Sequence, residues 1–211
     1  MSRVTTKTGL ANLTASLMKV EAVTQIDPPD ARSKFAKKAN QWYDETRRDV
    51  LAEHTWNFAL KRVQLPKDAT DPAFGYGARY LLPSDYIRLA TIGNEDNPEV
   101  DYKVEDGYIL CDISAPLDLR YVYNVEDVTK FSPKFIQCFA RKLKANLVYD
   151  MTGNRTMQQE AELEYLEYLS MAKGVDGQES PPTHRIRRSK WKAAKEGRSI
   201  LGSQYAGRVV T

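Results

Sequence analysis

Apolar side chains recur at intervals of three and four residues near the start of the chain, which is the spacing of one buried helix face. A first stripe comprises Leu10, Leu13 and Leu17. A second begins at Asp27-Pro28, where the aspartate can cap a helix and the proline suits its first turn. This second stripe comprises Ala31, Phe35, Ala39, Trp42, Thr46 and Val50. The pattern predicts a short helix followed by a long one, each with one apolar face.

The same spacing returns in the last third of the chain. Ser132-Pro133 is a capping residue followed by a first-turn proline, and Thr152-Gly153 marks the end of that segment. Asn154 can cap a further helix, which we expect to end at Gly174. The two stripes are Ile136, Phe139, Leu143 and Leu147, then Met157, Ala161, Tyr165, Tyr168 and Ala172. Helices from opposite ends of the chain are therefore expected to pack together.

Between these helices the period changes to two, which is the spacing of strands. Trp56 and Phe58 alternate with Asn57 and Ala59 in a run that ends before Pro66. Further strand candidates cover residues 79–82, 86–92, 100–104, 108–113 and 117–124, and Asp106-Gly107 is a typical tight hairpin turn between two of them. The fold class is therefore α+β. It has a helical bundle of about four helices (1–55 and 132–174), an inserted, mostly antiparallel β-sheet domain (56–131) and an extended C-terminal arm (175–211).

Charge is distributed unevenly along the chain. The 31 Lys and Arg nearly balance the 28 Asp and Glu, but residues 181–211 hold 8 basic and 1 acidic side chains. Residues 1–180 therefore hold 23 basic and 27 acidic side chains, a net charge of −4 against +7 in the tail. A mildly acidic body with a basic tail points to a partner outside the chain.

The cysteines and the N-terminal residues argue against a disulfide-bonded, zinc-binding, exported or membrane protein. Cys111 and Cys138 lie in different predicted elements and outside any CxxC spacing, so we expect buried thiols rather than a disulfide or a zinc site. Polar residues interrupt the N-terminal apolar positions. No apolar run approaches the roughly 20 residues that span a bilayer. We expect a soluble chain with no export signal and no membrane partner.

Candidates for catalysis are few. His54 and His184 are the only histidines, and neither has a partner at the spacing of metal ligands or of a catalytic triad. Acidic pairs could serve a glycosidase or a metal-dependent nuclease, but all of them fall in predicted loops, where carboxylates are usually solvated. The pairs are Asp68/Asp71, Glu95/Asp96 and Glu105/Asp106. Gly75-Tyr76-Gly77 lacks the strand-to-helix context of a nucleotide site. We expect no enzyme, no cofactor and no metal.

The arm carries the candidate binding residues. Pro181-Pro182 favours an extended backbone, and basic side chains with two large aromatics follow. The candidates are Arg185, Arg187, Arg188, Lys190, Trp191, Lys192 and Tyr205. Aromatic and arginine side chains are typical interface anchors, although a solvated terminus or a phosphate-binding arm has the same composition. We rank docking onto a protein first, a solvated tail second and DNA binding third.

The order of three motifs resembles a known family. A long helix leads into Trp56-Asn57-Phe58-Ala59, then come the segments 80–86 (YLLPSDY) and 132–135 (SPKF). Over roughly Leu10 to Lys173 this order is similar to that of the tail tubular protein A family, the head-to-tail adaptors of short-tailed bacteriophages.

This resemblance implies a structural virion protein without a catalytic site. Twelve copies would form a ring under the portal protein, with the helical part facing the portal and the sheet-rich part facing the tail nozzle or tail tube. Double-stranded DNA would pass through the lumen without sequence-specific binding, and tail fibres are a further partner left open. The protein would be made in the host cytoplasm and reside in the neck or tail of the virion. The alternative function is nucleic-acid binding through the basic C-terminal arm.

Two interpretations of Trp56 and Phe58 compete. A tryptophan and a phenylalanine that follow a helix can bury their rings where the bundle meets the sheet. A base-stacking platform, with Lys61 and Arg62 beside it, requires exposed rings along a basic groove. Because residues 1–180 are acidic overall, the sequence favours burial at the seam.

Overall fold

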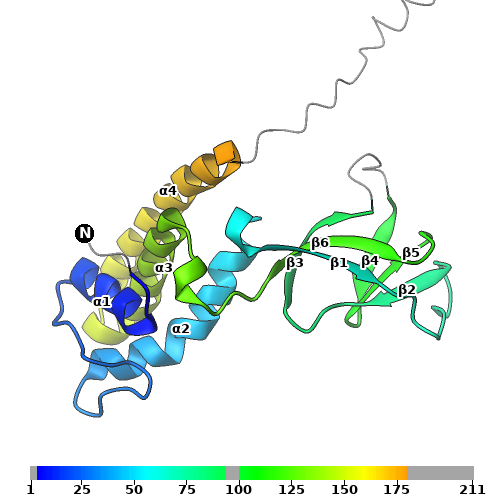
Figure 1. Cartoon of the computed structure of the whole chain (residues 1–211). Coiled ribbons are helices and arrows are strands. Elements are labelled where there is room, and N and C mark those ends of the chain that lie inside the picture. The colour runs from blue at the N-terminus through cyan, green and yellow to red at the C-terminus, as the bar shows by residue number, and fades with distance from the viewer. Residues whose placement is uncertain (1–3, 94–99, 180–211) are drawn as a thin grey trace, which may run out of the picture. The chain divides into compact units, whose positions relative to one another are not determined.

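The computed structural model describes residues 4–93 and 100–179, and it has the predicted α+β class (Figure 1). Its helices are α1 (Lys7–Met18), α2 (Lys34–Ala52), α3 (Pro133–Thr152) and α4 (Arg155–Glu179). Its strands are β1 (Leu60–Leu65), β2 (Ala78–Leu81), β3 (Tyr86–Ile92), β4 (Tyr102–Glu105), β5 (Tyr108–Cys111) and β6 (Leu117–Tyr123). The described residues all belong to one compact unit, residues 1–180.

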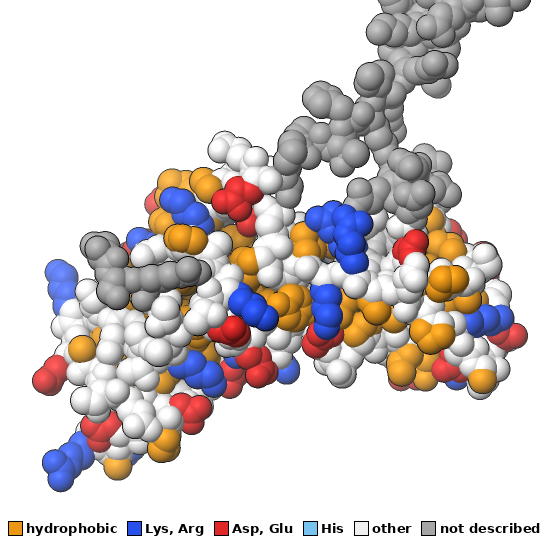
Figure 2. Space-filling view, in the orientation of Figure 1, with side chains coloured by type: hydrophobic (Ala, Val, Ile, Leu, Met, Phe, Trp, Pro, Cys, Tyr) orange, Lys and Arg blue, Asp and Glu red, His pale blue; other side chains and the backbone are white. Residues whose placement is uncertain are grey.

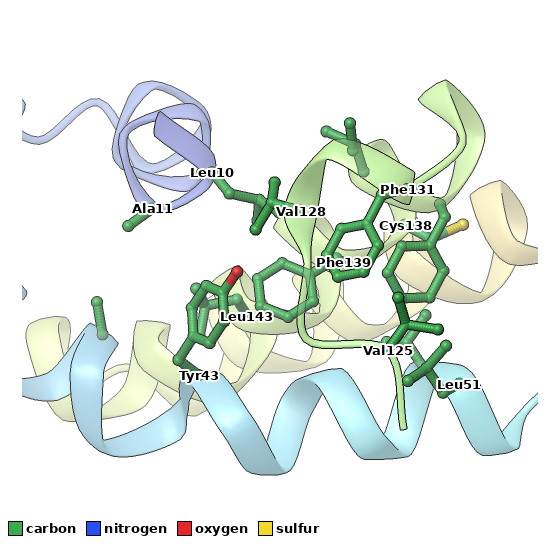
Figure 3. Packing of buried hydrophobic residues seen from close by; sticks show 14 of the residues in the cluster. Leu10, Ala11, Tyr43, Leu51, Val125, Val128, Phe131, Cys138, Phe139 and Leu143 are labelled. Carbon is green, nitrogen blue, oxygen red and sulfur yellow. The ribbon is translucent and has the colours of Figure 1, made fainter. Parts of the chain in front are cut away.

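Helix α3 lies at the centre of the bundle and contacts α1, α2 and α4. The four apolar positions predicted for its buried stripe are all buried, and so is Cys138. Figure 3 shows Tyr43 of α2 pointing toward Phe139 of α3, with the two ring centroids 4.9 Å apart. Burial raises the pKa of the Cys138 thiol to about 12, so this side chain is an inert part of the core.

The predicted ends of α3 are confirmed. Ser132 caps the helix, because its Oγ accepts a hydrogen bond of 3.3 Å from the Phe135 amide. Gly153 ends it with a φ of 68°, a left-handed conformation that favours glycine. Asn154 then accepts hydrogen bonds from the first amides of α4.

Two other helix boundaries differ from the prediction. Helix α2 begins at Lys34 instead of Asp27, because Ser33 supplies the cap through a 3.1 Å bond from the Ala36 amide. Helix α4 continues through Gly174 to Glu179, so residues 175–179, assigned to the arm, are helical. The glycine stop signal fails because Gly174 does not adopt the left-handed conformation and because Asp176, 5% exposed, packs into the body.

The strands form two antiparallel sheets where the pattern predicted one. The strand orders are β1-β6-β3 and β2-β5-β4. Inward side chains of both sheets share a second core, which includes Tyr80, Ile109, Leu119 and Tyr121. The alternation of apolar residues identifies the inward faces, but it cannot tell one sheet of six strands from two stacked sheets of three.

Trp56 and Phe58 lie at the seam between bundle and sheets, as the favoured interpretation predicted. The Trp56 side chain is 0% exposed, and its Nε1 donates a 2.8 Å hydrogen bond to the Val50 carbonyl. Its ring packs edge-on against Phe135, and Phe58 contacts both Phe131 and Phe135. The strand assignment for this stretch is wrong, since residues 57–59 form a short 3-10 helix before β1 starts at Leu60.

Candidate functional site

The predicted binding residues of the arm all lie outside the described residues. They are Arg185, Arg187, Arg188, Lys190, Trp191, Lys192 and Tyr205, and the acidic pair Glu95/Asp96 lies outside as well.

A buried carboxylate joins the end of α4 to the start of the β-rich part. Asp176 Oδ2 lies 3.0 Å from His54 Nε2, and both carboxylate oxygens accept the Asn57 amide at 3.3 Å. The Asn57 side chain returns a 2.7 Å hydrogen bond to the Asp176 carbonyl. The His54 ring also meets Trp56 edge-on, with centroids 5.1 Å apart. We name these four residues the junction cluster.

The junction cluster contains a His–Asp pair but its contacts are those of a structural clamp. Each carboxylate oxygen of Asp176 is bonded to the chain, and the bonds run to the segment that leads into β1. The sequence did not reveal the pair because 122 residues separate its members. It was also hidden because Asp176 was assigned to the arm, beyond the expected helix end.

A groove crosses the outer face of the β1-β6-β3 sheet. Its volume is about 450 Å³, and it is lined by Arg62, Val63, Gln64, Thr91, Gly93, Asp118, Leu119 and Arg120. A second hollow of about 200 Å³ shares Thr91 and Arg120 with it and reaches His54 and Asp176. Arg62 and Arg120 are paired in register across β1 and β6, and Gln64 donates a 2.9 Å hydrogen bond to Asp118 on the same face. This surface carries cations, an amide and a carboxylate side by side.

The described loop carboxylates are engaged in structural contacts. Asp68 accepts hydrogen bonds from the Thr70 amide and from Arg79, and these bonds hold its pKa below the usual value. Asp71 pairs with Lys67 at 2.7 Å. A general acid requires a raised carboxyl pKa, which is the opposite of what Asp68 shows. Glu105 lies 4.0 Å from Lys103 on an exposed strand, and Asp106 forms the predicted hairpin turn with a φ of 48°.

Asp85 belongs to a small network beneath the bend between β2 and β3. Lys61 donates to its Oδ2 at 2.9 Å, and the Tyr121 hydroxyl donates to its Oδ1 at 2.8 Å. The amide of Asn124 donates a 2.7 Å bond to the Asp85 carbonyl. The network fastens the bend to β1 and β6.

The aromatic stripe of α4 is used for packing. Tyr165 is buried, and Arg141 lies 4.2 Å over the ring of Tyr168, while Met157 is exposed. Carboxylates on the same helix pair with α3: Glu162 with Lys142 at 2.9 Å and Glu164 with Lys144 at 2.6 Å. These contacts fix α4 on α3.

The described residues hold neither a cluster of metal-ligating side chains nor a membrane-spanning helix. Nowhere in residues 4–93 and 100–179 do three His, Cys, Asp or Glu side chains come together as a metal site needs. No helix within the same ranges is both long and apolar enough to cross a membrane.

Comparison with known proteins adds no relative. The chain matches no protein-family model, and a comparison with curated proteins finds no match.

Proposed function

We propose that this chain is a structural adaptor that forms a ring between the portal and the tail of a short-tailed bacteriophage. The observation that supports it most is the order of parts. Two helices precede an inserted antiparallel β-rich part and two helices follow it, and an aromatic seam joins the two. This is the organisation that the resemblance implies.

The three motifs behind the resemblance each have a structural role at a boundary of the fold. Trp56-Asn57-Phe58-Ala59 forms the seam between bundle and sheet. The segment 80–86 makes the bend that carries Asp85. Ser132 and Phe135 begin α3 and supply both its cap and a core ring. Motifs with such roles specify an architecture, which is what a ring-forming structural protein needs in place of reactive side chains.

Reconstitution with a portal tests this proposal. The chain should be mixed with portal rings expressed from the portal gene of the same genome. Native mass spectrometry then measures the mass of the complex. We expect twelve copies of this chain per portal ring. Rings arise from heterologous contacts whose rotation closes, so a defined copy number distinguishes assembly from adhesion. Failure to bind the portal, or a variable number of copies, would contradict the proposal.

The charge of the tail supports the second candidate function, nucleic-acid binding, since residues 181–211 carry a net charge of +7. The full chain and a chain truncated after Glu179 should be compared for binding to portal rings and to duplex DNA. The adaptor proposal expects truncation to abolish portal binding. If truncation spares portal binding and removes only DNA binding, the tail acts on nucleic acid. Binding to DNA would also fall steeply with salt, because each neutralised phosphate releases counterions.

A further inference from the structure

Helix α4 is apolar on two opposite sides. Its inner side packs on α3 through Ala161, Tyr165, Leu169 and Ala172. Its outer side exposes Leu163 at 62%, Leu166 at 50% and Met171 at 59%. Figure 2 shows hydrophobic side chains at the surface over α4. A helix that is buried on one side alone has no need of the second apolar side.

Five positions form one line along this outer side: Leu163, Leu166, Ser170, Gly174 and Gly177. Their successive spacings are three, four, four and three residues, which is the repeat of a seam between two helices. All five are exposed. We name this line the outer seam.

Packing within the described residues does not explain the two glycines of the outer seam. Neither has a positive φ, and apart from the backbone of α4 itself no atom of the described part lies within 4 Å of a Cβ added at either one. A glycine inside a helix weakens it relative to alanine, so two glycines in its last turns are a cost to α4. Glycine at such a position is useful when another helix approaches closely.

The spacing of the outer seam reads the same in both directions, with Ser170 at its centre. If a second α4 pairs antiparallel about Ser170, Leu163 of one copy lies across from Gly177 of the other, and Leu166 lies across from Gly174. Each leucine meets a glycine, and the two serines meet each other. Leu166 enters the space between Ser170, Lys173, Gly174 and Gly177, which is the geometry of a knob in a hole.

We propose that the outer seam of α4 binds a second copy of this chain in an antiparallel, two-fold contact. The half of the seam that carries the leucines is complementary to the half that carries the glycines, and such self-complementarity is the property of an isologous interface. A contact made by one helix from each copy buries less than the roughly 1,200 Å² of a standard stable interface. The dimer is therefore weak and depends on concentration, with dissociation in the micromolar range.

This inference does not rest on the proposed function. A ring needs heterologous contacts, whereas the outer seam is isologous, so the pairing describes the free protein before any ring assembles. A chain that forms rings on the portal but never dimerises would overturn this inference and leave the adaptor proposal standing.

Sedimentation of the full chain measures the pairing directly. We expect a reversible monomer–dimer equilibrium over about 1 to 300 µM, the range in which micromolar affinities appear. Leu166→Asp should abolish the dimer. The matched control is Leu81→Asp, since Leu81 is also exposed, at 58%, but lies on β2. A chain that is monomeric throughout, or a dimer that Leu166→Asp leaves intact, overturns the proposal.

A cysteine placed at the two-fold axis tests the register. Ser170→Cys should form an intermolecular disulfide under a mild oxidant, because residue 170 meets its own copy. The native cysteines are buried and do not compete. Gln178→Cys is the control, since Gln178 is also exposed on α4, but its two copies would lie about 24 Å apart along the helix axis at 1.5 Å per residue. Crosslinking of both variants alike overturns the register.

Gly174→Ala is expected to change the stability of the monomer and the affinity of the dimer in opposite directions. Alanine should raise the melting temperature of the monomer, because it has a higher helix propensity than glycine and the added Cβ meets open space. The same methyl fills the space that receives Leu166, so dimer affinity should fall about tenfold. If affinity rises together with stability, the glycines do not serve this contact.

Discussion

Trp56 is fully buried although it follows two polar residues and precedes an asparagine. The ring packs against His54, Phe58 and Phe135, and its one polar atom is bonded to the Val50 carbonyl. Burial of the whole ring with its hydrogen bond satisfied removes apolar surface from water without leaving a donor unpaired. This one buried side chain therefore anchors the connection between α2 and β1 in the core.

Replacement of Trp56 by alanine should lower the free energy of unfolding by about 3 to 5 kcal/mol, the cost of deleting a large buried ring. Chemical denaturation followed by circular dichroism measures the loss. Phe74→Ala is the control and should change little, because Phe74 is 89% exposed. A stable Trp56→Ala variant with weakened DNA binding would instead support the stacking platform.

Asp85 links stability to pH. Partial burial raises the pKa of its carboxyl, but the hydrogen bonds from Lys61 and Tyr121 outweigh burial and hold the pKa below the usual 3.8. A group whose pKa is lowered by folding stabilises the protein above its unfolded pKa, and the stabilisation is lost as pH falls through the folded value.

The variant Asp85→Asn should therefore lose less stability than the parent between about pH 5 and pH 3, because the parent alone has this carboxylate to protonate. Urea denaturation at several pH values measures the slope. Equal slopes for Asp85→Asn and the parent would show that the network around Asp85 does not respond to acid.

At the scale of elements, the start of α2 is set by the residue whose side-chain oxygen caps its first amides. Ser33 binds the Ala36 amide, whereas Asp27 stands in a loop where Ile26 bridges Pro29, and it lies 3.6 Å from Lys7. Ser33→Ala should lower the free energy of unfolding by about 1 kcal/mol, as loss of a helix cap does. Asp27→Ala should cost less, and thermal melting of the two variants compares them. A larger effect at Asp27 would mean that α2 is stabilised from the earlier position.

Most elements were predictable from the sequence because their own residues carry the signal. The stripe of α3, the cap Ser132 and the turn Asp106-Gly107 are all local patterns, and each is confirmed. Strand β3 has the predicted bounds of Tyr86 and Ile92. Arg47 lies outside the predicted apolar stripe of α2, yet it is only 2% exposed, because Asp44 and Asn124 bind its guanidinium. A contact with a residue far away in the chain, such as Asn124, does not show in the spacing of apolar and polar positions.

At the scale of the whole molecule, the junction cluster ties parts that the sequence separates widely. Asp176 and Asn57 are 119 residues apart, and their mutual hydrogen bonds could not be predicted from spacing. The boundary at 174 was wrong for the same reason, since the last turn of α4 is fixed by hydrogen bonds to Asn57, in the segment that leads into β1. The seam aromatics were predictable because large rings between a helix and a strand have few other uses.

Truncation measures how much the last turn of α4 contributes. A chain that ends at Glu179 should melt close to the full chain, because it keeps the junction cluster. A chain that ends at Lys173 loses Asp176 and with it the bonds to His54 and Asn57, so it should be less stable by about 1 to 3 kcal/mol. Identical melting of the two truncated chains would show that the cluster contributes nothing to stability.

The junction cluster also determines where mechanical load enters the molecule. Tension applied at Glu179 reaches Asp176 three residues earlier, and from there it passes through Asn57 and His54 to the root of β1. These bonds lead from the end of α4 directly to the segment before β1, alongside the packing of α4 on α3. The contacts of Asp176 with His54 and Asn57, 2.7 to 3.3 Å long, couple the two segments, so part of a pull at Glu179 is delivered at the base of β1.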